Sequence, residues 1–235
     1  MDSDKLQPAI KIISTGSQGN AVVINKNILI DCGVPFKKLK DVYKDLKLVF
    51  LTHKHSDHFN PCTIRAIHKN RPSLRFCCCE WMIEPLIKAG VSKKNIDVFE
   101  LNKQYFYGGL VLLEPVPLVH DVPNCGWKLE IVLKAFPIEE AQYSKVFYAT
   151  DTANLDGIEA PGYDWYLVEG NYSEADIERR IAEKEAAGEF CYEARAREVH
   201  LSKEQAVEWL AENMGPDSHY MLIHQHREKI KEVNK

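Results

Sequence analysis

The chain lacks three features that mark other classes of protein. It contains no run approaching the ~20 apolar residues of a membrane-spanning helix, and its opening segment, MDSDKLQPAIKII, is charged and does not resemble a signal peptide. It also has no excess of basic residues, because 30 Lys and Arg are set against 34 Asp and Glu. We therefore expect a cytoplasmic protein with no membrane partner, in which nucleic-acid binding would need a local basic patch.

Paired cysteines are also missing. The seven cysteines are odd in number and none forms a Cys-x-x-Cys pair, which argues against a thiolate zinc knuckle. Cys77, Cys78 and Cys79 are adjacent, so on a strand they would point to alternate faces and make poor disulfide partners. This usage indicates a reducing compartment and a buried strand at LRFCCC.

No repeat, low-complexity tract or linker divides the 235 residues. Short β-branched apolar runs alternate instead with stretches of helical period. Asn60 and Pro61 predict the start of one helix, and Ser202 with Gln205 predicts the start of another. Strands with helices between them predict an α/β protein, which we expect to be a single domain over residues 1–235.

Five of the apolar runs end in a residue that can bind a metal ion. The sheets of α/β proteins place ligand sites at the carboxyl ends of their strands, where the loops separate. We therefore expect these five residues to converge at one edge; they are Asp31, His53, His120, Asp151 and His224.

The segment LTHKHSDHF supplies further candidate ligands. Alternate residues of an extended segment face the same way, so His53 and His55 can reach one ion together. Asp57 and His58 follow as the chain turns, and they can face a second ion. Asp31 is placed to accept a hydrogen bond from a ligand histidine and orient its ring.

The remaining ligands come from later in the chain. His120 can complete the first site, Asp151 has two oxygens with which to bridge both ions, and His224 can complete the second site, with His219 and His226 as nearby rivals. Imidazoles and carboxylates suit two divalent ions, zinc first, with manganese or iron as alternatives. Two such ions with a water between them would generate a hydroxide nucleophile at neutral pH.

This pattern resembles the metallo-β-lactamase superfamily over nearly the whole chain, with each of its five motifs matched by the residues above. The resemblance implies a four-layer αββα sandwich with the metals at one edge. Within the superfamily, the chain is most similar to the YycJ-like (WalJ-like) group, through the segments STGSQGN (14–20), HDVPNCGW (120–127), YATDTA (148–153), VEGN (168–171) and HLSKEQAVEW (200–209).

The resemblance also implies an activity, which is 5′-to-3′ exonuclease cleavage of DNA. It makes His200 the general acid that protonates the leaving group, and Asp57 is the other candidate catalytic residue. Two candidate substrate contacts, Ser17 and Asn20, lie in a loop that is equally explained as a plain turn. Three more lie in a basic segment that is equally explained as a solvated helix face, namely Arg195, Arg197 and Lys203, and the last is Asn171 of the segment VEGN.

Two other functions use the same ligands. A thioester or lactone hydrolase of the glyoxalase II kind is one, and a binding module that retains the metals or sequesters a nucleotide is the other. The short interval between Asp151 and His224 leaves no room for the large cap of the β-CASP nucleases. DNA, RNA and small phosphodiesters all remain open as substrates, as does the oligomeric state.

Overall fold

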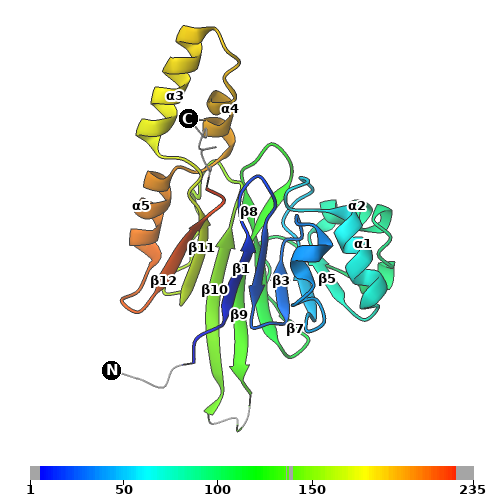
Figure 1. The fold of residues 1–235 in the computed structure, drawn as a ribbon. Coiled ribbons are helices and arrows are strands. Elements are labelled where there is room, and N and C mark those ends of the chain that lie inside the picture. The colour runs from blue at the N-terminus through cyan, green and yellow to red at the C-terminus, as the bar shows by residue number, and fades with distance from the viewer. Residues whose placement is uncertain (1–5, 136, 138–139, 226–235) are drawn as a thin grey trace, which may run out of the picture.

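A computed structural model describes residues 6–135, 137 and 140–225. Two mixed β-sheets of six strands face each other, and helices cover the outer face of each sheet (Figure 1). The α/β four-layer sandwich expected from the sequence is therefore confirmed. None of the helices in the described part of the chain has the length and apolar character that crossing a membrane requires.

The first sheet has the strand order β1-β2-β3-β4-β5-β6. Its strands β1 to β3 pair antiparallel, and β3 to β6 pair parallel through helical crossovers. Its central strands are buried on both faces, which explains their unbroken apolar sequences. The strands are β1 (Ile10–Ser14), β2 (Ala21–Ile24), β3 (Ile28–Ile30), β4 (Leu48–Phe50), β5 (Arg75–Cys78) and β6 (Ile96–Val98).

The second sheet has the order β12-β11-β10-β9-β8-β7. Strands β7 to β10 form an antiparallel meander, and β10 to β12 pair parallel. The chain crosses from β10 to β11 through the loop over residues 150–164, and from β11 to β12 through three helices. The strands are β7 (Tyr105–Tyr107), β8 (Val111–Leu118), β9 (Asn124–Lys134), β10 (Gln142–Ala149), β11 (Trp165–Glu169) and β12 (His219–Ile223).

Helices on the two outer faces begin where the sequence indicated. The Asn60 side chain accepts a hydrogen bond from the Thr63 backbone N–H at the start of α1 (Pro61–Asn70). Ser202 and Gln205 form a complete capping box at the start of α5 (Lys203–Asn213). The first sheet is covered by α1 and α2 (Ile83–Lys88) with the short helices η1 (Phe36–Leu39), η2 (Glu80–Met82) and η3 (Lys93–Asn95), and the second sheet is covered by α5.

The main apolar core lies between the sheets. Phe50 of the first sheet meets Trp127 of the second edge-on, with ring centroids 4.9 Å apart. Cys77 and Cys79 point into this core, whereas Cys78 points to the layer under the helices. The buried strand predicted for the three adjacent cysteines is therefore confirmed, and their alternation across the sheet explains why they remain free thiols.

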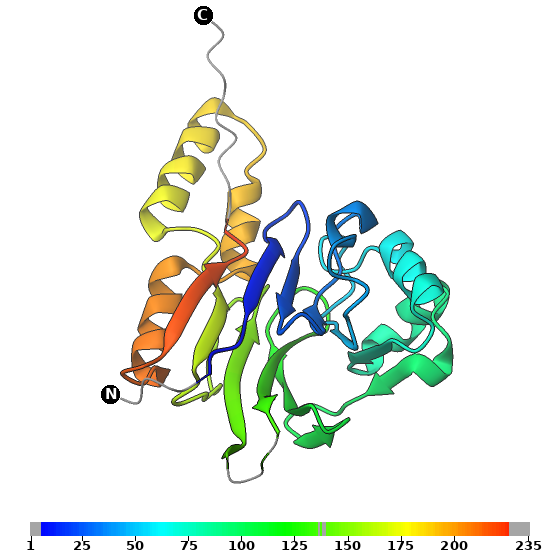
Figure 2. The same ribbon diagram turned by 60° about the horizontal axis from the view of Figure 1, so that its bottom comes forward.

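A helical hairpin stands apart from the layers. It consists of α3 (Glu174–Ala187) and α4 (Tyr192–Val199), and it projects beyond the ends of β11 and β12 (Figures 1 and 2). Gly188 ends α3 in the left-handed conformation, with φ of 65°, which a residue without Cβ adopts readily. An ion pair of 2.6 Å between Lys184 and Glu193 ties the two helices together.

Candidate metal centre

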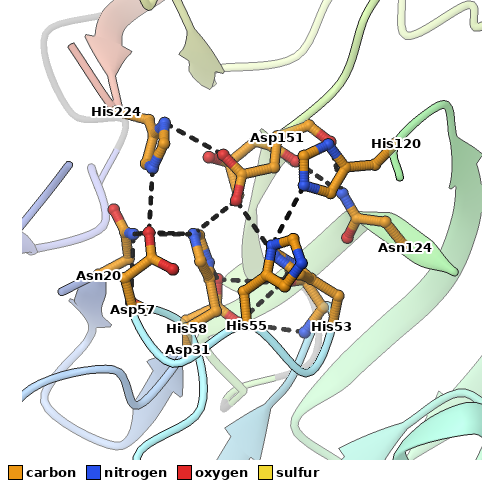
Figure 3. Close-up of polar contacts among 12 residues, drawn as sticks. Asn20, Asp31, His53, His55, Asp57, His58, His120, Asn124, Asp151 and His224 are labelled. Carbon is orange, nitrogen blue, oxygen red and sulfur yellow. Dashed lines mark hydrogen bonds and ion pairs between the residues drawn. The ribbon is translucent and has the colours of Figure 1, made fainter. Parts of the chain in front are cut away.

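The polar residues that follow the strands meet at one edge of the sandwich (Figure 3). Three of them, Asp31, Asp151 and His224, have positive φ values between 51° and 58°. Asp and His tolerate this region better than branched residues do, and the sharp turn directs each side chain out of the strand direction. The Asn124 side chain stabilises one such turn by donating to the carbonyls of Thr150 and Asp151, at 2.9 and 2.7 Å.

A first group of donor atoms comes from His53, His55, His120 and Asp151, and one ligand atom of each lies within 4.8 Å of the others. His53 Nε2 is 3.1 Å from Asp151 Oδ2, and His55 Nδ1 is 3.3 Å from His120 Nε2. His53 and His55 leave the same extended segment two positions apart, which is why their rings meet here, with centroids 4.8 Å apart.

A second group comes from Asp57, His58, Asp151 and His224, again within 4.8 Å. His58 Nε2 is 2.8 Å from Asp151 Oδ2, and His224 Nε2 is 3.3 Å from Asp57 Oδ2. Asp151 thus belongs to both groups. Of the two rivals of His224, His219 lies at the opposite end of β12 and stacks on Trp165, and His226 lies outside the described residues.

The residues present fit a pair of divalent cations. Two buried atoms at the centre, His53 Nε2 and Asp151 Oδ1, have no hydrogen-bond partner among the described residues. His53 Nε2 lies near Asp151 Oδ2, and Asp151 Oδ1 lies near His224 Nδ1. Leaving such atoms unpaired is unfavourable, and a cation between them would satisfy both. Imidazole and carboxylate donors suit zinc, manganese and iron.

The protonation of the imidazoles follows from their surroundings. Burial, aided by the neighbouring His58, lowers the pKa of His53 to about 4, so this ring is neutral as a metal ligand must be. Burial acts against protonation of His224 as well, but Asp151, Asp57 and Glu169 outweigh it and raise the pKa to about 9. Protons therefore balance part of the buried negative charge when no cation does.

Asp31 contacts the candidate ligand His58 from the interior of the protein. It is fully buried and accepts hydrogen bonds from the backbone N–H and the hydroxyl of Thr52, both at 3.0 Å, and from the Tyr148 hydroxyl at 3.2 Å. Oδ2, the oxygen that accepts from Tyr148, also lies 2.7 Å from His58 Nδ1. That contact directs His58 Nε2 toward Asp151, which is the orienting role expected for Asp31.

Asn20 differs from expectation. Its side chain is only 2 % exposed, and it bonds to the Gly16 N–H, to the Asp57 carbonyl and, at 2.8 Å, to His58 Nε2. These contacts fix the loop beside Asp57, and the structure gives the expected substrate contact of Asn20 no support.

His200 is connected to the same centre by Glu169, a residue that the sequence did not lead us to expect there. Its Nδ1 is 2.8 Å from Oε1 of the fully buried Glu169, which is also 2.9 Å from His224 Nδ1. Burial opposes protonation of His200, but Asp151 and Glu169 outweigh it and raise its pKa to about 10. Glu169 closes the apolar run WYLV, so the rule that identified Asp31 and Asp151 also points to it.

A cavity of about 220 Å³ opens over the two donor groups, and it is lined in part by α4. Ser17, Asn171 and Arg195 are on its wall. Arg197 and Lys203 are not, because Arg197 lies on another face of α4 and Lys203 begins α5, so their expected substrate contacts are not supported.

Asp121 is a second residue that the sequence reasoning missed. One oxygen lies 3.3 Å from His55 Nε2 and 3.2 Å from His120 Nε2. The other oxygen pairs with Arg195 at 2.6 Å. The only signal in the sequence is that Asp121 directly follows a candidate ligand.

Comparisons with known proteins agree with this architecture. The exodeoxyribonuclease WalJ of Streptococcus pneumoniae serotype 2 (strain D39 / NCTC 7466) is 25 % identical over 226 residues, covering 87 % of this chain and 76 % of that protein. The metallo-β-lactamase fold protein YhfI of Bacillus subtilis shares the fold with a TM-score of 0.65 at 16 % identity, covering 93 % of this chain and 87 % of that one.

The short form of human tRNase Z shares the fold as well, with a TM-score of 0.65 at 14 % identity and coverage of 92 % of each chain. The sequence also matches the family described as the beta-lactamase superfamily domain over residues 26–225, which is most of its length. With that match and this fold, the chain belongs to the metallo-β-lactamase superfamily, and within it the chain is similar to WalJ.

Proposed function

We propose that this protein is a dinuclear-metal-dependent phosphodiesterase that cleaves nucleic acid, with DNA cleaved from the 5′ end as the first candidate reaction. The main observation is that a single cavity brings together two donor groups that share Asp151 and an imidazole, His200, whose Nδ1 lies 2.8 Å from Glu169 Oε1. The similarity to an exodeoxyribonuclease supports DNA as the substrate.

The donor groups assign the ligands. We assign His53, His55 and His120 to one cation and Asp57, His58 and His224 to the other, with Asp151 shared. Two divalent ions, zinc first and manganese or iron as alternatives, would neutralise the phosphate and activate water for attack at phosphorus. The His58 and His224 contacts hold the pKa of Asp57 well below its usual range despite burial, so Asp57 remains a carboxylate that can bind and orient.

His200 supplies the proton for the departing oxygen. In the metal-free protein, Asp151 and Glu169 raise the pKa of His200 despite its burial, and the Glu169 contact at Nδ1 leaves Nε2 for the substrate. The side chain is 18 % exposed and lines the cavity, so the proton is accessible to a bound phosphodiester. An alkoxide is a poor leaving group, which is why this proton accelerates cleavage of DNA.

A thioester hydrolase of the glyoxalase II kind is the competing function. It could use the same donor groups, but a thiolate leaves without a proton and gives no role to the pair that Glu169 forms with His200. The presence of that pair favours the phosphodiesterase. A non-catalytic nucleotide-binding protein is a third function, and the experiment below distinguishes it from the two enzymes.

The experiment compares two phosphodiesters with different leaving groups. The metal-loaded protein, with its metal content measured, is given end-labelled single- and double-stranded DNA and RNA, bis(p-nitrophenyl) phosphate and S-lactoylglutathione. His200→Ala should lower kcat on DNA by roughly 10²–10⁴-fold, the usual contribution of a general acid. It should affect bis(p-nitrophenyl) phosphate far less, because p-nitrophenolate leaves unprotonated.

His219→Ala serves as the matched control, because His219 stacks on Trp165 away from the centre. Turnover of S-lactoylglutathione without turnover of any phosphodiester would establish the thioester hydrolase instead. Tight nucleotide binding with no product from any substrate would leave a binding protein. Equal losses on both phosphodiesters in His200→Ala would remove His200 from the role of acid.

A further inference from the structure

The helix α4 forms one wall of the cavity with a single face. Tyr192, Arg195, Ala196 and Val199 line the cavity, and their spacing of three and four residues places them on the same side of the helix. The Val199 carbonyl lies 3.1 Å from His120 Nδ1. This contact ties the position of α4 to a residue of the first donor group.

The charge of this wall is concentrated in one residue. Among the described residues that line the cavity, Arg195 is the one with a permanent positive charge, and Asp57, Asp121 and Asp151 are negative. The Arg195 side chain is 71 % exposed, and its partner Asp121 touches His55 and His120 through the other carboxylate oxygen. The Asp121 carboxylate therefore connects Arg195 to the first donor group.

The ion pair between Arg195 and Asp121 can open readily. Exposed ion pairs contribute little to stability, because water solvates both partners when they separate. A planar guanidinium binds a phosphate with two parallel hydrogen bonds, which makes phosphate a strong competitor for Arg195. The Tyr192 ring, which is 44 % exposed on the same face, lies beside that phosphate, and the Lys184 ammonium lies 5.7 Å from its centroid.

We propose that Tyr192 and Arg195 form a subsite for one unpaired nucleotide next to the bond that is cut, with Arg195 passing from Asp121 to a substrate phosphate and Tyr192 stacking on the base. This inference rests on the proposed function and specifies its substrate as a single strand. Base stacking on an aromatic ring with one cationic contact is how single strands are commonly bound.

The surroundings of the subsite are unsuited to a duplex. The hairpin over residues 173–199 carries eight acidic and five basic residues, so it offers no broad basic surface along which two backbones could lie. The cavity of about 220 Å³ is below the usual range of roughly 300–1,000 Å³ for small-molecule sites, so it is too small to take a base pair.

The chain contains a matched control for Arg195. Arg197 is exposed on the same helix two positions further on, and it does not line the cavity. Two residues along a helix correspond to a rotation of about 200°, so Arg197 lies on the opposite side of α4. Arg197→Ala removes the same charge from the same helix without touching the subsite.

The test measures KM and binding on metal-loaded protein with a single-stranded oligodeoxynucleotide, its duplex and bis(p-nitrophenyl) phosphate. Arg195→Ala and Tyr192→Ala should each raise KM for the single strand by about 10-fold, which is typical of one lost base or phosphate contact. The increase should be smaller for bis(p-nitrophenyl) phosphate, which has no base. Tyr192→Phe retains the ring and should restore KM, and Arg197→Ala should match the wild type.

Salt dependence supplies a second readout. Loss of one phosphate contact should reduce the slope of log KM against log salt by about 0.7 in Arg195→Ala, the value for one contact to a single strand. Equal KM in Arg195→Ala and Arg197→Ala, or a wild-type preference for the duplex, would overturn the subsite. Fluorescence anisotropy of the labelled single strand separates the two proposals, because Arg195-dependent binding without turnover refutes the phosphodiesterase and retains the subsite.

Discussion

Asp31→Asn tests how the metal centre is supported. Asp31 is fully buried and its two oxygens are surrounded by donors: the Thr52 N–H and hydroxyl, the Tyr148 hydroxyl and His58 Nδ1. Asparagine has the same shape and tolerates the φ of 58° found at this position. The change therefore replaces one acceptor oxygen and the negative charge by an NH₂ group that faces donors.

The expected effect has two parts. Hydrogen bonds to charged groups contribute about 1.5–3 kcal/mol each, and losing the charge weakens all four while misdirecting at least one. We expect the free energy of unfolding to fall by about 3 kcal/mol. We also expect His58 to lose the contact that fixes its ring, so the affinity of the cation site formed by Asp57, His58 and His224 should fall by roughly 10–100-fold.

A competitive chelator titration that resolves two binding steps measures the affinities, and urea unfolding measures stability. Tyr148→Phe is the control, because it removes one of the four hydrogen bonds and leaves both the charge and the His58 contact in place. It should lower stability by about 1 kcal/mol and leave both affinities near the wild type. Unchanged affinity in Asp31→Asn, or an equal loss in Tyr148→Phe, would refute this reasoning.

Two further predictions concern the buried charges. The folded-state pKa values of about 10 for His200 and about 9 for His224 lie above the unfolded value of about 6.5, so their stabilisation of the metal-free protein is complete below pH 6.5 and is lost as the pH rises through 9 to 10. Thermal unfolding of chelated protein from pH 6 to 10 checks this, and a Tm that increases would contradict it. Glu169→Gln removes the carboxylate at His200 Nδ1, so the alkaline limb of the kcat profile on DNA should move to lower pH. A limb that stays in place would show that Glu169 does not set the pKa of His200.

The arrangement of the donors was largely predictable from local sequence. An apolar run that ends in Asp or His predicts a polar residue at the end of a strand, and the structure brings Asp31, His53, Asp151 and His224 together at such ends. The spacing of His53 and His55 followed from the two-residue period of extended backbone. The inference about strand ends and the inference about His53 and His55 both depend only on residues that are neighbours in sequence. They therefore hold in any fold that buries the strand.

The supporting contacts depended on the tertiary structure. Glu169 meets His200 across 31 positions, and Asp121 meets Arg195 across 74. In sequence, Arg195 and Arg197 are equivalent candidates, and only the packing of α4 against His120 decides which one faces the cavity. The burial of the Asn20 side chain likewise depends on the tertiary structure and could not be read from the sequence. The sequence by itself therefore determined which polar residues follow the strands, because strand period and apolar runs are local properties. The fold decided which distant side chains pair, because pairing depends on how the sheets and the hairpin pack together.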